Sequence, residues 1–86
     1  MIKRPVTIQL QSGLETRPAA LLVQVASQFR SEIYLEVDNQ KRVNAKSIMG
    51  MMTLGLDSGD EVVVSVNGED EEKALQEIEA YLTNQK

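Results

Sequence analysis

The chain has 86 residues, of which 42% are hydrophobic and 26% charged, a composition typical of one globular domain. Histidine and cysteine are both absent. Their absence excludes histidine as a base or phosphoryl carrier, thiolate catalysis, disulfides and metal sites built on these ligands. We therefore expect a single domain over residues 1–86 that needs no cofactor and no metal.

The net charge is −4, and residues 69–86 carry all of it, with six acidic residues against two lysines. Only three residues are aromatic. A direct nucleic-acid binder needs a basic surface and stacking side chains, and a membrane-surface helix needs a basic amphipathic face. The sequence predicts neither, and no apolar run is long enough to span a bilayer. We expect a cytoplasmic protein.

The first half of the chain predicts a strand, a helix and a hairpin. Apolar residues alternate over 2–10, as in a strand with one buried face, and Pro5 places that strand at a sheet edge because proline cannot donate a ladder hydrogen bond. A helix begins near Pro18, after Thr16 or Arg17, and its apolar spacing continues to about residue 29. Strands over 33–37 and 43–45 then flank a polar turn at 38–40.

The second half predicts a short helix, a strand and a long helix. Ser47 opens a Met-rich segment that forms two helical turns to about residue 54. Valines alternate over 61–66 in the strongest strand signal of the chain, and Asn67-Gly68 turns it. The final helix has an apolar stripe over 74–82. The acidic turn before it, residues 69–72, is expected to serve only helix capping and solubility.

Two segments carry more than a hydrophobic pattern. Residues 13–20, Gly-Leu-Glu-Thr-Arg-Pro-Ala-Ala, and residues 44–56, Asn-Ala-Lys-Ser-Ile-Met-Gly-Met-Met-Thr-Leu-Gly-Leu, resemble the two signature sites of the HPr phosphocarrier family of bacterial sugar phosphotransferase systems. The tail from Gly68 is similar as well. The resemblance spans nearly the whole chain and implies an α+β open-faced sandwich, βαββαβα, in which three helices cover one face of a four-stranded antiparallel sheet.

The first signature departs from the family at its reactive residue. The phosphocarriers have a histidine there, and this chain has Glu15. A carboxylate can act as a nucleophile and form an acyl phosphate, so a phosphocarrier that uses Glu15, or one that serves an unusual pathway, is the alternative hypothesis. Two other interpretations of Glu15 stay open. It is an inert acid near a helix N-terminus, or its charge beside Arg17 occupies the place of a phosphohistidine.

The second signature is intact, and by resemblance Ser47 is the regulatory serine that an ATP-dependent HPr kinase/phosphorylase phosphorylates. Members that lack the histidine but keep this serine are of the catabolite repression HPr type. The resemblance therefore implies that the protein is not an enzyme but a corepressor of a catabolite-control transcription regulator. The simpler interpretation is that Ser47 only caps a helix, and both can hold, because a phosphate is tolerated beside free helix N–H groups.

We expect the regulator to bind a surface around Ser47 that is formed by Arg17, Lys46, Ile48, Met49 and Met52. Arg17 suits bidentate contacts with phosphate or carboxylate. Lys46 either aids docking or is merely solvated. The three apolar side chains are expected to stay partly exposed, while the others of 48–54 pack on the sheet.

An inactive relic that neither carries phosphate nor binds the regulator is a further alternative. The first strand, at an edge and followed by a short connection, makes a strand-exchanged homodimer a further hypothesis.

Overall fold

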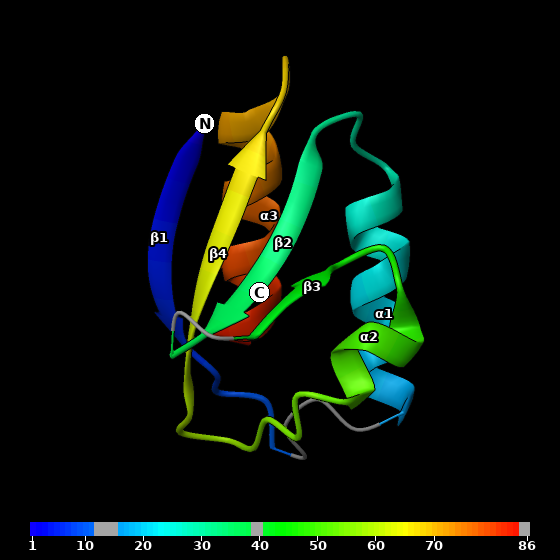
Figure 1. The fold of residues 1–86 in the computed structure, drawn as a ribbon, viewed down its shortest axis with the longest axis vertical. Coiled ribbons are helices and arrows are strands. Elements are labelled where there is room, and N and C mark those ends of the chain that lie inside the picture. Colours follow the sequence, from blue (N-terminus) through cyan, green and yellow to red (C-terminus); the bar gives the residue numbers. More distant parts are fainter. Residues whose placement is uncertain (12–15, 39–40, 85–86) are drawn as a thin grey trace.

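The computed structural model describes residues 1–11, 16–38 and 41–84. Four strands and three helices alternate in the predicted order (Figure 1). The strands are β1 (Ile2–Thr7), β2 (Glu32–Val37), β3 (Lys41–Asn44) and β4 (Glu61–Asn67). The helices are α1 (Thr16–Ser27), α2 (Ile48–Met52) and α3 (Glu71–Leu82).

The sheet is antiparallel, with the strand order β1-β4-β2-β3. β4, the valine-rich strand, therefore lies inside the sheet, and β1 with its Pro5 lies at an edge, as predicted. In Figure 1, α1 and α3 lie on the same side of the sheet, and α2 lies beside α1 near the β3 edge. This arrangement is the open-faced sandwich that the resemblance implied.

The core lies between the sheet and the helices, and it follows the predicted periodicities. Val62, Val64 and Val66 of β4 are buried, as is the helical stripe that faces them. Those helical residues are Leu22 and Ala26 of α1 and Ala74, Leu75, Ile78 and Leu82 of α3. Burial of alternate strand positions and of one helix stripe accounts for the period-2 and period-3.6 patterns in the sequence.

The opposite face of the sheet carries a charged layer. Glu36 lies 3.5 Å from Lys3 Nζ and 3.5 Å from Arg42 Nε, so it links β1 and β3 through β2. The Arg42 guanidinium also lies 3.9 Å from the centre of the Tyr34 ring. Ser65, whose neighbours in the ladder are Lys3 and Tyr34, is buried on this face. These long side chains shield the face of the sheet opposite α1 and α3.

Four elements differ from the prediction at their ends. β3 spans Lys41–Asn44 and not 43–45, α2 ends at Met52 and not near residue 54, and β1 and α1 also end early. β1 stops at Thr7 because the Gln9 N–H leaves the sheet and donates to Leu82 O at the end of α3, at 2.8 Å. α1 stops at Ser27 because Gln28 and Phe29 donate to carbonyls only three residues back. The predicted turn at 38–40 lies partly outside the described residues, and Asp38 enters it at φ 55°.

Candidate functional site

Ser47 begins α2 with the predicted capping geometry. Its backbone is extended, at φ −118° and ψ 109°, and its Oγ accepts a hydrogen bond from the Gly50 N–H at 3.3 Å. The side chain is exposed. The cap gives one unpaired N–H of the first helical turn a partner, which is why a five-residue helix starts at this position.

The segment that leads to Ser47 is held by four hydrogen bonds. The Ala45 N–H donates to Ile33 O at 2.8 Å, and the Ser47 N–H donates to Asn44 O at 3.0 Å. The Lys46 N–H donates to Asn44 Oδ1 at 2.8 Å, and Lys46 Nζ donates to Phe29 O at 2.8 Å. The exposed serine therefore stands on a fixed loop between β3 and α2.

The structure contradicts one of the two interpretations of Lys46 that the sequence allowed. Its ammonium group is half-buried and donates to a backbone carbonyl just after α1, so it is not merely solvated. The bond ties the loop before Ser47 to the loop between α1 and β2. Whether Lys46 also contacts a partner stays a prediction.

The side chains of α2 divide into a packed set and an exposed set. Met51 is fully buried, and Ile48 packs against the core while remaining partly exposed. Met49 is 78% exposed and Met52 is 45% exposed. Gly50 faces the sheet, where an added Cβ would lie 3.3 Å from Val43 Cβ and 3.5 Å from Ser47 Oγ. The two exposed methionines therefore lie on the same short helix as the Ser47 cap.

Arg17 lies in the first turn of α1, and its side chain is exposed. That turn is fixed by α3, because the Tyr81 hydroxyl donates to Pro18 O at 2.8 Å. Burial raises the pKa of the Tyr81 hydroxyl. α1 and α2 pack side by side (Figure 1), so Arg17 lies on the helix next to the one that Ser47 caps. Glu15 lies outside the described residues.

Leu21 is an exposed apolar residue that the sequence analysis did not single out. It is 45% exposed on α1, the helix against which α2 packs. The sequence could have predicted this exposure, because Leu21 lies outside the helical spacing that places Leu22 and Ala26 on the buried face of α1. A leucine outside that stripe does not enter the core and remains an exposed apolar side chain of α1.

The acidic turn before α3 does more than cap and solubilise, so that prediction was wrong for Asp70. Asp70 makes no side-chain bond to its own helix. Its carboxylate instead accepts hydrogen bonds from the Ser31 hydroxyl and from the N–H groups of Arg30 and Ser31, both at 3.0 Å. The bond from the Ser31 hydroxyl, followed by that from the Arg30 N–H, lowers the pKa of Asp70 to about 2. Glu71 does serve the turn, since its Oε1 accepts from the Gly68 N–H at 3.2 Å.

Neither a metal cluster nor a membrane span is evident in the described residues. Within 1–11, 16–38 and 41–84, no group of three or more acidic side chains is placed to hold a metal ion. No helix in the same ranges is both long and apolar enough to cross a membrane. The feature that remains is an exposed hydroxyl at a fixed helix start beside exposed methionines. This arrangement suits a modification and the docking of a partner.

Comparisons with known proteins give one consistent result. A protein-family model described as the PTS HPr component phosphorylation site matches residues 2–84. The HPr-like protein Crh of Bacillus subtilis (strain 168) is 49% identical over 82 residues, which are 95% of each chain.

Solved structures agree with these sequence matches. The phosphocarrier protein HPr of Bacillus anthracis has a TM-score of 0.90 at 43% identity and covers 94% of this chain and 95% of its own. A Bacillus subtilis Crh crystal structure, described as a swapped dimer, has a TM-score of 0.80 at 47% identity, covering 99% of this chain and 97% of its own.

Proposed function

This chain belongs to the HPr family, and from that premise we propose that it is a regulatory member whose switch is the phosphorylation of Ser47. The observation that carries the proposal is the Ser47 hydroxyl, exposed at the start of α2 beside the exposed Met49. An ATP-dependent HPr kinase/phosphorylase transfers the γ-phosphoryl group to Ser47 Oγ, while ADP leaves and the hydroxyl proton is released. Such a kinase uses cytoplasmic ATP, so we place the protein in the cytoplasm.

The surroundings of Ser47 favour this modification over a purely structural role. Its Oγ accepts one long hydrogen bond of 3.3 Å, and Gly50 places no side chain over it. The phosphate adds about −1.5 to −2 charges and three acceptor oxygens beside the first N–H groups of α2. Because the loop before Ser47 is already fixed, the phosphate is exposed without any rearrangement of that loop.

The phosphorylated surface binds a catabolite-control transcription regulator, and the protein acts as its corepressor. The packed helices α1 and α2 offer three kinds of group to a partner. The phosphate supplies charge, Arg17 supplies a planar cation for acidic groups of the partner, and Met49 and Met52 supply flexible apolar contacts. Ile48 and Lys46 complete the proposed surface with their accessible parts. Any effect on DNA passes through the regulator, because the chain carries a net charge of −4.

The alternative is a phosphocarrier that uses Glu15, and the test of the proposal distinguishes the two. The purified protein is incubated with ATP and HPr kinase/phosphorylase, or with phosphoenolpyruvate and the first enzyme of a phosphotransferase system. Intact-mass spectrometry then counts the phosphoryl groups. We expect one group from ATP and none from phosphoenolpyruvate.

Two variants identify the residue that carries the phosphoryl group. Ser47→Ala should abolish labelling by ATP, and the matched variant Ser58→Ala, which alters another exposed serine, should leave it unchanged. Labelling by phosphoenolpyruvate that Glu15→Gln removes would establish the carrier instead. An unlabelled protein under both conditions would support the inactive relic.

We also propose that the chain forms a homodimer by exchange of β1. Two observations support it: β1 pairs with β4 alone, at the sheet edge, and the related Crh structure is a swapped dimer. Exchange keeps every strand pair and replaces an intramolecular one with an intermolecular one. Sedimentation velocity over a range of concentrations should show slow exchange between monomer and dimer. A single monomeric species up to millimolar concentration would contradict it.

A further inference from the structure

The free edge of β1 carries backbone groups with a defined pattern. Beyond the end of β1, the Ile8 N–H donates to Asp60 O at 2.8 Å, and its C=O accepts from the Gly59 N–H at 2.7 Å. Antiparallel strands alternate, so the even residues of β1 direct their backbone groups toward β4 and the odd ones away. Pro5, which lacks an N–H, falls in the outward set. The N–H groups of Lys3 and Thr7 and the carbonyls of Lys3 and Pro5 therefore point away from the sheet.

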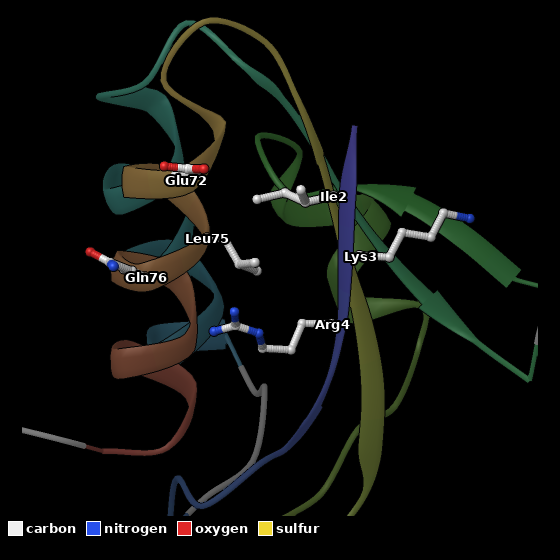
Figure 2. A pocket seen from close by; sticks show the side chains of 6 residues that line it. All are labelled: Ile2, Lys3, Arg4, Glu72, Leu75 and Gln76. Carbon is white, nitrogen blue, oxygen red and sulfur yellow. The ribbon is translucent and has the colours of Figure 1, made fainter.

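A hollow of about 340 Å³ lies next to this edge, between β1 and α3. Figure 2 shows its lining, in which Ile2 and Arg4 point from β1 toward the helix and Leu75 points back toward the strand. Glu72 and Gln76 line the helix side, and Lys3 points to the opposite face of the sheet. Ile2 and Leu75 thus form an apolar floor beneath an edge with open hydrogen-bonding groups.

The charges around the hollow leave one carboxylate uncompensated. Arg4 Nη1 lies 2.7 Å from Glu79 Oε1, and Lys3 Nζ lies 3.5 Å from Glu36 on the other face. Glu72 is exposed, and no ion pair involving it occurs among the residues that the structure describes. A ligand in the hollow therefore meets the apolar side chains of Ile2 and Leu75 and one carboxylate, that of Glu72, without an ion-pair partner among the described residues.

We propose that this edge binds an extended, cationic peptide segment of a partner protein, which adds to the sheet as a fifth strand. The segment pairs with the N–H and C=O of Lys3 and with the carbonyl of Pro5. Side chains of a strand alternate, so an apolar side chain and a Lys or Arg two residues away both face the hollow, over Ile2–Leu75 and beside Glu72 respectively. Pro5 limits the pairing to the start of β1.

A second copy of this chain suits the edge less well. Antiparallel pairing of two β1 strands would place a Pro5 in each strand, and neither proline can donate a ladder hydrogen bond. The surface also lies at the sheet edge opposite β3 and α2 (Figure 1). A partner bound here therefore leaves the Ser47 surface accessible.

The probe for a test is the peptide acetyl-Thr-Lys-Thr-Val-Thr-amide, titrated into the ¹⁵N-labelled protein. We expect amide shifts that centre on Lys3 and α3, with a Kd of about 1 mM, typical of a short unstructured ligand. Lys3→Pro removes the outward N–H and should abolish binding, whereas Lys3→Ala keeps that N–H and should retain it. The spectrum of each variant shows whether it is folded.

A charge-swap experiment tests the role of the Glu72 carboxylate independently. Glu72→Lys should weaken binding about fivefold or more, and a peptide with Glu in place of its Lys should bind this variant better than the original peptide does. Glu77→Lys, which alters another exposed acid of α3, should change nothing.

Equal binding by Lys3→Pro and Lys3→Ala, or no shift at 5 mM peptide, about five times the expected Kd, would overturn the proposal. Exchange of β1 leaves the outward amides of Lys3 and Thr7 unpaired. Shifts of these two amides that depend on protein concentration alone, and that the peptide does not alter, would therefore overturn the proposal in favour of a second copy paired at this edge.

Discussion

At the residue scale, Asp70 shows how one carboxylate joins two distant loops. It accepts three hydrogen bonds from Arg30 and Ser31, about forty positions earlier, and they lower its pKa from an ordinary 3.8 to about 2. A lowered pKa means that the folded state binds this proton less readily than the unfolded chain does. The carboxylate therefore stabilises the fold above pH 4, and the contribution disappears as the pH falls toward 2.

The variant Asp70→Asn should accordingly be less stable than the parent at pH 7, and its stability should depend less on pH between 4 and 2. Urea denaturation at intervals across this range measures both effects. Parallel stability curves for parent and variant would show that the Ser31 and Arg30 bonds do not favour the charged form.

Ser47 has a stabilising role of its own as the cap of α2. Ser47→Ala removes the acceptor for the Gly50 N–H and should lower the free energy of unfolding by about 1 kcal/mol. Ser58→Ala, on a surface turn, should stay within about 0.5 kcal/mol. Urea denaturation at pH 7 checks both, and an unchanged midpoint for Ser47→Ala would mean that α2 does not need its cap.

At the element scale, the turn between β4 and α3 depends on a glycine. A Cβ at Gly68 would lie 2.5 Å from Ser31 Oγ and 2.6 Å from Ser31 Cα, closer than atoms can approach. A side chain there must separate the turn from the loop before β2 and thereby disturb the bonds of Asp70 to that loop.

Gly68→Ala should therefore cost about 3 kcal/mol of stability. Gly55→Ala is the matched control, because that position has φ +60° with open space around it, and it should cost about 1 kcal/mol for backbone strain alone. Thermal unfolding of the two variants provides the comparison. Similar costs would show that the approach of Gly68 to Ser31 is not what limits this turn.

The elements differ in how far sequence predicts them. β4 was predicted almost to its last residue, because alternating valines record burial of one face and β4 is inside the sheet. The ends of β1 and α1 were misjudged because Ile8 and Phe29 are buried without belonging to the element whose pattern they continue. The order of elements follows local signals, and their ends depend on bonds to distant segments.

The functional site likewise combines features that follow from local sequence with features that depend on distant segments. The Ser47 cap follows from local chemistry, and the division of α2 into buried and exposed side chains follows from its short length. The bond from Lys46 to Phe29 O and those from Ser31 and Arg30 to Asp70 join segments that are far apart in the sequence. No periodicity records such pairs, so only the three-dimensional structure reveals them.

At the scale of the whole molecule, the two sheet edges present different chemistry. The β3 edge lies near α2 and the proposed switch, and the β1 edge carries the hollow against α3. The sheet and α1 separate them. A small domain can in this way offer one surface that responds to phosphorylation and another that does not.

The central claim is that phosphate at Ser47 creates the surface that the regulator recognises. Its most direct test is the affinity of the purified catabolite-control regulator for the phosphorylated and unphosphorylated protein, measured by isothermal titration calorimetry. New charge-assisted hydrogen bonds to the phosphate predict binding at least about tenfold tighter after phosphorylation. Equal affinity of the two forms would contradict the account.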